Sequence, residues 1–181
     1  MDSMQRDLAD VAAAIRNEIR LEAEEAEREA AASAALQRSL ADVARELMAH
    51  GDTVAVDAGH RVFAGEIVGV GTDVVSVEAG ACRVDVNLHC VARIRVLTRA
   101  RSGGRPPSGG PSSLRARLLE LQLSQEAVEA GTGANDEEVT GPIALVGCDH
   151  VAIGEGVGPE WFLPLHSVAY VRTRDLSREG F

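Results

Sequence analysis

The spacing of apolar residues predicts helix over the first 50 residues. Residues 1–50 contain neither proline nor glycine. Apolar side chains recur there every three or four positions, which is the repeat of one helix face, in two series: Leu8, Val11, Ile15, Ile19 and Leu36, Leu40, Val43, Leu47. The pattern predicts an outer helix over about residues 4–32 and an inner helix over about 36–49, either continuous or broken near Ser33. Gly51 fits the C-cap of the inner helix.

Beyond Gly51 the pattern becomes that of β-structure. Short β-branched runs separated by glycines indicate five strands between residues 52 and 98. Residues 99–113 are rich in Gly, Pro, Ser and Arg and predict a flexible linker. A short amphipathic helix is expected over residues 114–126, capped by the serines before it. Strand-like runs return afterwards, at 127–130, 138–146, 150–153, 161–165 and 168–172.

The second half of the chain repeats the first. Residues 65–77 match residues 141–153 at an offset of 76, and residues 88–95 match residues 165–172 at an offset of 77. Ser39-Leu40 matches Ser113-Leu114 at an offset of 74. Three blocks in the same order indicate an internal duplication, in which each half is a helix followed by five strands. Superposing the halves should place His89 on His166 and Asp73 on Asp149.

Composition and charge exclude several classes of function. A net charge of −10 argues against a general electrostatic grip on nucleic acid or anionic lipid. No apolar run is as long as a membrane helix, and the first residues lack the pattern of a signal peptide, so we expect a soluble cytoplasmic protein. Three cysteines without a Cys-x-x-Cys pair suggest neither a disulfide framework nor a metal site. No hydrolase, P-loop or metalloprotease motif is present, so we expect no enzyme and no cofactor.

The order of elements in each half resembles the Sm-like fold. A helix precedes a strand, a bent strand with Gly-x-Ile, a Gly-x-Asp turn, a β-branched strand and a final Leu-His-x-Val-Ala segment. The bacterial Hfq family has this plan and a Lys-His pair at its last strand; here the pairs are Leu88-His89 and Leu165-His166, with Leu in place of Lys. The layout is also similar to a group of two-barrel proteins of high-GC bacteria, a resemblance that implies no activity.

The resemblance implies a mainly β protein with helices, of the α+β class. It would contain two tandem Sm-like (SH3-like) five-stranded barrels, each preceded by a helix. The expected parts are a helical extension at 1–35, a first barrel at 36–98, the linker at 99–113, a second barrel at 114–173 and a tail at 174–181. Gly65 and Gly141 would permit the bend of the long strand.

The resemblance also implies candidate RNA contacts. In the Hfq family the matching histidine helps bind uridine-rich RNA, which points to His89 and His166; the alternative is a histidine that bonds a backbone carbonyl at a strand end. Asp73 and Asp149 could contact a base or ribose, or stabilise their turns. The basic residues near the barrel exit could meet phosphates, or could keep the linker soluble: Arg93, Arg95, Arg172, Arg99, Arg101 and Arg105. Loss of the Lys removes a charge that would hold phosphate.

The first apolar series has no obvious barrel to cover. An isolated amphipathic helix favours a partner, so Leu8, Val11, Ile15 and Ile19 predict oligomerisation or docking on another protein. The helix lacks the basic clusters of a membrane-surface helix. Trp161 and Phe162 open the last strand of the second barrel, where alternation places one of them outward unless a bulge intervenes. Two functions remain open: a divergent Sm-like RNA-binding module, or a protein-interaction scaffold that has lost the RNA site.

Overall fold

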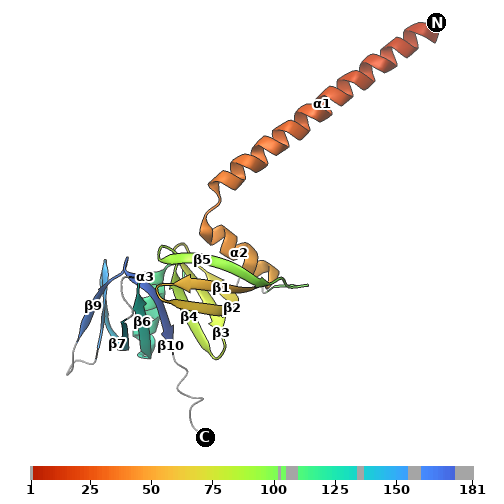
Figure 1. Cartoon of the computed structure of the whole chain (residues 1–181). Coiled ribbons are helices and arrows are strands. Elements are labelled where there is room, and N and C mark those ends of the chain that lie inside the picture. The colour runs from red at the N-terminus through yellow and green to blue at the C-terminus, as the bar shows by residue number, and fades with distance from the viewer. Residues whose placement is uncertain (1, 102, 105–109, 134–136, 155–159, 174–181) are drawn as a thin grey trace. The chain divides into compact units, whose positions relative to one another are not determined.

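The computed structural model contains two units, Met1–Ser39 and Leu40–Phe181. It describes residues 2–101, 103–104, 110–133, 137–154 and 160–173, with the backbone alone for residues 2–14 and Ala92. The first unit is one helix, α1 (Asp2–Gln37), drawn in red to orange in Figure 1. Neither predicted alternative holds: the helix continues past Ser33, because the alanine-rich stretch 30–35 has high helix propensity, and it ends at Gln37 before α2. Leu36, 88% exposed, belongs to this helix and not to the next one.

The first half of the second unit is a helix followed by five strands. These are α2 (Leu40–His50), β1 (Thr53–Ala58), β2 (Arg61–Val70), β3 (Val74–Ala79), β4 (Cys82–Asn87) and β5 (Val91–Thr98). Helix α2 buries Ala41, Ala44, Leu47 and Met48. Gly51 ends it in the left-handed conformation with φ +75°, and its amide donates to the Met48 carbonyl at 3.1 Å. The predicted C-cap is confirmed.

The second half has the same succession of elements. It contains α3 (Leu114–Ser124), β6 (Ala127–Thr132), β7 (Glu138–Val146), β8 (His150–Ile153), β9 (Trp161–Pro164) and β10 (Val168–Thr173). The hydroxyl of Ser113 accepts a hydrogen bond from the Ala116 amide at 3.1 Å, so the expected serine cap is present.

The ten strands formed by the described residues belong to one antiparallel sheet, in the order β5-β1-β2-β3-β4-β10-β6-β7-β8-β9. The α+β class is therefore confirmed, but two separate barrels are not found: the sheet is open and continuous. The halves join where β4 pairs with β10, in the register Val86 with Tyr170, Asp85 with Val171 and Val84 with Arg172. A strand edge exposes unpaired amides and carbonyls, and this pairing satisfies those of β4.

Within each half, the second strand bends between its two neighbours. Residues 61–66 of β2 pair with β1, and residues 66–70 pair with β3. Gly65 lies at the change of partner, where a Cβ would stand 1.9 Å from the Glu78 carbonyl oxygen. Only glycine permits this approach of two backbones, as the sequence indicated.

The two halves share their cores. One apolar cluster includes Phe63 and Val86 of the first half together with Tyr170 of β10. The other, formed mainly by α3 and the second half, includes Val74 of β3. The described ends of the predicted linker also pack on the first half, since the Gly104 amide donates to the Ala49 carbonyl at 3.1 Å and the Thr72 amide to the Ser112 carbonyl at 2.9 Å. The described ends of the predicted linker therefore contact the first half.

Candidate functional site

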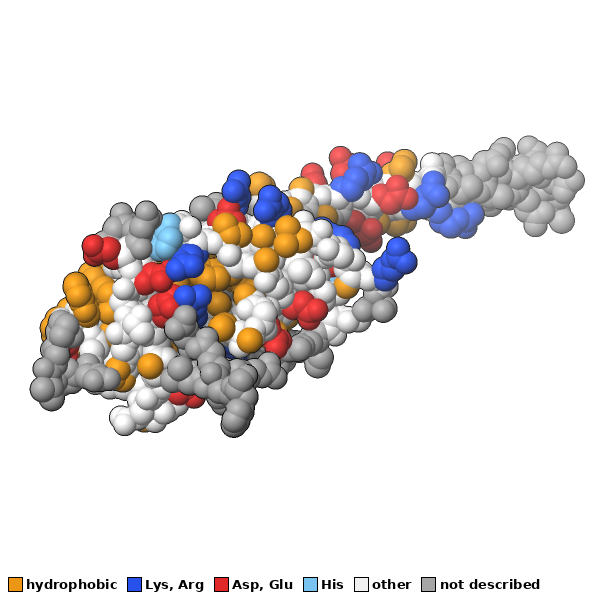
Figure 2. Space-filling view, turned by 60° about the horizontal axis from the view of Figure 1, so that its bottom comes forward, with side chains coloured by type: hydrophobic (Ala, Val, Ile, Leu, Met, Phe, Trp, Pro, Cys, Tyr) orange, Lys and Arg blue, Asp and Glu red, His pale blue; other side chains and the backbone are white. Residues whose placement is uncertain are grey.

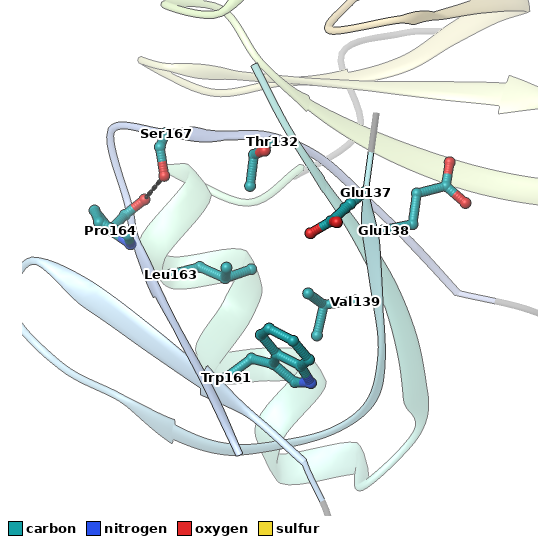
Figure 3. Close-up of a pocket in the computed structure, with 8 residues that line it drawn as sticks. All are labelled: Thr132, Glu137, Glu138, Val139, Trp161, Leu163, Pro164 and Ser167. Atoms are coloured by element: carbon teal, nitrogen blue, oxygen red, sulfur yellow. Dashed lines mark hydrogen bonds between the residues drawn. The ribbon is translucent and has the colours of Figure 1, made fainter. Parts of the chain in front are cut away.

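An open cavity of about 520 Å³ lies at the outer edge of the second half. It is lined by Thr132, Glu137, Glu138, Val139, Trp161, Leu163, Pro164 and Ser167. In Figure 3 the side chains of Trp161, Leu163 and Val139 turn toward one space, with the ribbon of α3 behind them. Glu137 also points toward this space, whereas Glu138, its neighbour along β7, points away from it.

Strand β9 forms the outer rim of this cavity and ends the sheet. Among the described strands it pairs only with β8. Trp161 is 49% exposed and Phe162 is 60% exposed, although both belong to the strand. Figure 2 shows hydrophobic side chains at the surface on the left, the side on which β9 lies in Figure 1. Trp161 turns toward the cavity (Figure 3), and both side chains stay partly exposed because the edge beside them is not covered by a described strand.

The corresponding place in the first half is filled. By the offsets of the repeat, Val139 corresponds to Phe63 and Leu163 corresponds to Val86. Tyr170 of β10 lies between this Phe63 and Val86: its ring centroid is 4.8 Å from that of Phe63, it is opposite Val86 in the ladder, and it is fully buried. The cavity of the second half is therefore the same site without its aromatic side chain.

A polar cluster closes the filled site. The Tyr170 hydroxyl donates to Glu138 Oε1 at 2.5 Å, and Arg61 of β2 donates to the same oxygen at 2.7 Å. Burial alone would raise the pKa of the Glu138 carboxyl, but these hydrogen bonds outweigh it and lower that pKa to about 2. Burial and the Glu138 carboxylate raise the pKa of Tyr170. The cluster links β2 of one half to β7 and β10 of the other.

The histidine-bearing turns of the two halves meet at the β4–β10 junction. His89 lies in the β4–β5 turn and His166 in the β9–β10 turn, and both side chains are exposed. The Cys90 thiol contacts the His166 carbonyl oxygen at 3.3 Å, and the Asn87 side-chain amide donates to the Val168 carbonyl at 2.9 Å. The turns therefore lie side by side, and neither histidine lies within a strand.

The two turn aspartates occupy equivalent places with different partners. The Asp73 carbonyl accepts a hydrogen bond from the Leu88 amide at 2.8 Å, and the Asp149 carbonyl accepts one from the Leu165 amide at 2.7 Å. The Asp73 carboxylate also accepts from the Leu114 amide at 2.7 Å, at the start of α3. The Asp149 carboxylate lies 2.8 Å from Nδ1 of the His150 ring, and this contact lowers the pKa of Asp149. Asp73 thus anchors a helix.

Three of the six candidate arginines are paired with carboxylates. Arg172 pairs with Glu129, Arg93 with Asp57, and Arg99 with the buried Asp52. Arg95 and Arg101 are exposed, and Arg105 lies outside the described residues. The charges of the three paired arginines are therefore balanced by carboxylates within the chain.

The predicted oligomerisation stripe lies on α1. The side chains of Leu8 and Val11 are outside the described part, while Ile15 and Ile19 are exposed. No helix within the described residues is long and apolar enough to cross a membrane. In the same residues, no three His, Cys, Asp or Glu side chains are grouped to hold a metal ion.

Sequence reasoning missed the cavity and the Tyr170 site. One signal was present: the run Val168-Ala169-Tyr170-Val171 is continuously apolar, as in a strand covered on both faces. Its counterpart in the first half, residues 91–94 of β5, carries Arg93 in the place of Tyr170. No family model matches the sequence, and no curated protein matches it.

Proposed function

We propose that the protein is a non-enzymatic interaction scaffold that binds an extended polypeptide strand along β9. The observation that supports it is the unfilled cavity beside this edge, at the position that Tyr170 of β10 fills in the first half. A strand added to a sheet edge gains main-chain hydrogen bonds, and the pocket for an alternate side chain gives selectivity. Trp161 and Phe162 supply exposed apolar area for the bound strand.

A kinship with the Sm-like fold is part of this proposal. It is supported by the order of elements in each half, a helix followed by five antiparallel strands, with the last strand beside the first. The glycine at the bend of β2 supports it as well. On this proposal the chain has kept a fold whose edge strands can pair with other strands, and it uses the edge of β9 to bind a partner strand inside the cell.

Fluorescence of Trp161 tests the proposal, because this is the one tryptophan of the chain. The probe is a synthetic peptide with the sequence of residues 167–173, the segment that occupies the edge of β4. Addition of the peptide should shift the emission of Trp161 to shorter wavelength and saturate, as the half-exposed indole becomes covered. A peptide with proline in place of its tyrosine serves as the control, since proline cannot join a ladder in mid-strand. An unchanged emission with both peptides contradicts the proposal.

The meeting of the two histidine turns favours a second candidate, binding of single-stranded RNA. His89 and His166 are exposed on adjacent turns, and histidine can stack on an unpaired base. The test is fluorescence anisotropy of a labelled uridine-rich RNA with wild type and with His89→Ala/His166→Ala. Binding that the double variant loses would support RNA recognition, and no binding at low salt would exclude it.

A further inference from the structure

We propose that the strand bound by β9 belongs to another protein and carries a tyrosine followed, two residues later, by an arginine or lysine. This inference rests on the proposed function and names the chemistry of the partner. Side chains at positions i and i+2 of an extended strand point to the same face. The tyrosine and the cation therefore enter the cavity beside β9 together, and its volume of about 520 Å³ lies within the range of about 300–1,000 Å³ of ligand pockets.

The internal junction shows how a strand of this kind is held. Tyr170 of β10 lies opposite Val86 of β4, and its ring packs edge to face on Phe63, with the ring centroids 4.8 Å apart. Arg172, two residues further along β10, lies opposite Val84. A tyrosine and a cation on one face of a strand are thus already accommodated at the edge of β4.

The repeat transfers this register to β9. At the offset of 77, Val86 corresponds to Leu163 and Val84 corresponds to Trp161. A strand bound in the same register places its tyrosine opposite Leu163 and its cation opposite Trp161. The side chains of these two residues of β9 line the cavity and turn into it (Figure 3). The cavity is therefore where both side chains of the bound strand are recognised.

The apolar walls of the cavity fit an aromatic ring. Val139 is the counterpart of Phe63 and, like Leu163, is 9% exposed. Valine is smaller than phenylalanine, so it leaves room beside Leu163. A ring that enters between the two side chains is removed from water, as the fully buried ring of Tyr170 is at the internal junction.

The rim of the cavity favours a tyrosine over a phenylalanine. At the internal junction Arg61 of the first half lies at the tip of the Tyr170 ring, where both side chains donate to Glu138 Oε1. The counterpart of Arg61 is Glu137, which is exposed and points toward the cavity (Figure 3). A carboxylate only accepts hydrogen bonds, and a phenol hydroxyl is a donor that the ring of phenylalanine lacks.

The charge at this edge is reversed relative to the first half. Two arginines of the first half, Arg61 and Arg83, correspond to Glu137 and Glu160 of the second. Both glutamates are exposed, and Glu160 directly precedes Trp161. A guanidinium or ammonium group is attracted both to carboxylates and to the face of an indole. A cation opposite Trp161 therefore satisfies both features of the edge.

Fluorescence anisotropy of labelled peptides tests the tyrosine. The first peptide is residues 167–173, Ser-Val-Ala-Tyr-Val-Arg-Thr, and two others carry phenylalanine or phosphotyrosine in place of the tyrosine. The full chain should bind the phenylalanine peptide about tenfold more weakly, because a hydrogen bond to a charged group is lost. It should bind the phosphotyrosine peptide more weakly still, because the phosphate meets the Glu137 carboxylate.

A variant of Glu137 shows whether this residue reads the hydroxyl. Glu137→Ala should bind the tyrosine and phenylalanine peptides equally. Glu126→Ala is the matched control, because it removes an exposed carboxylate at the other end of β6 and should keep the preference for tyrosine. The side chains of both glutamates are exposed, so both variants should fold, and circular dichroism verifies that they do.

The cation is tested by a peptide with citrulline in place of its arginine, which keeps the shape of the side chain and removes its charge. Wild type should bind this peptide about threefold more weakly, as expected for a cation–π contact at a half-exposed site. Trp161→Leu should reduce the difference between the arginine and citrulline peptides. An unchanged difference would overturn the placement of the cation against Trp161.

The outcomes separate this inference from the proposed function. Equal binding of the tyrosine, phenylalanine and phosphotyrosine peptides would mean that β9 accepts strands without reading their side chains, which overturns the inference and leaves the proposed function standing. Absence of binding by every peptide overturns both. Release of bound peptide as the protein concentration rises would mean that a second copy takes the edge, and this also overturns the inference.

Discussion

The two halves of the sheet share one plan and differ at their outer edges. The fourth strand of the first half is covered by β10, whereas the outer edge of the fourth strand of the second half, β9, is covered by no described strand. At the covered edge Tyr170 fills the site beside Phe63, and at the open edge a cavity of about 520 Å³ takes its place. The difference shows how a duplicated unit can satisfy one edge within the chain and keep the other for a partner.

The largest difference between the halves should follow from Tyr170 and its counterpart Arg93. Tyr170→Ala removes a fully buried ring and should lower the free energy of unfolding by about 4 kcal/mol. Arg93→Ala removes an exposed side chain whose pair with Asp57 is worth at most about 1 kcal/mol. Urea denaturation of both variants measures the contrast. Equal losses would mean that β10 does not hold the halves together.

Asp85 and Phe162 give the next contrast. Asp85→Ala leaves the half-buried guanidinium of Arg117 without its buried partner and should cost about 3 kcal/mol of unfolding free energy. Phe162→Ala removes an exposed ring and should change the unfolding free energy of the isolated chain by less than about 0.5 kcal/mol. Thermal unfolding at low protein concentration measures both. A large loss for Phe162→Ala there would show that the open edge is covered within the chain.

The acid sensitivity of the junction should depend on Glu138. Because its pKa is lowered to about 2 in the folded chain, its stabilising effect is complete above the ordinary carboxyl pKa of about 4.5. It is lost as the pH falls from about 4.5 to about 2. Wild type should therefore lose more stability over this window than Glu138→Gln. Denaturation series at pH 5, 4 and 3 measure the two slopes, and parallel slopes would exclude the role of the carboxylate.

The smallest effect is expected from the histidine turns. His89→Ala/His166→Ala removes two exposed side chains for which no contact within the chain is described, and should leave the unfolding free energy within about 0.5 kcal/mol of wild type. Cys90→Ser is a matched control variant in the same turn, because the serine hydroxyl can still donate to the His166 carbonyl. A marked loss in the histidine variant would assign the histidines to the fold instead of to a ligand.

Local pattern sufficed to predict the strands of each half. The period of β-branched residues placed β7 and β8 at the residues where the structure has them, and Gly65 marked the bend. The end of α1 was missed, because Leu36 and Leu40 continue one helical repeat and no glycine or proline stands between them. A pattern of that kind gives no sign of a break at residues 38–39.

The candidate site depended on contacts that local pattern does not contain. Arg172 looked available for phosphate until the register placed it opposite Glu129. Asp73 looked like a turn residue, and its bond to Leu114 joins elements about 40 residues apart. The pairing of β4 with β10 leaves the edge of β9 free. Because the two halves are duplicates, their edges are equivalent in pattern, and the pattern does not say which of them is paired. Only the apolar run around Tyr170 distinguished them in the sequence.

Amide hydrogen exchange of the two fourth strands tests the central claim most directly. The amides of β4 should be protected at every protein concentration, because β10 covers them within the chain. The amides of residues 160–163 should exchange rapidly in the free chain and become protected when the peptide of residues 167–173 is added. Protection of β9 that is the same with and without the peptide, whether high or low, would contradict the view that its edge is kept for a partner strand.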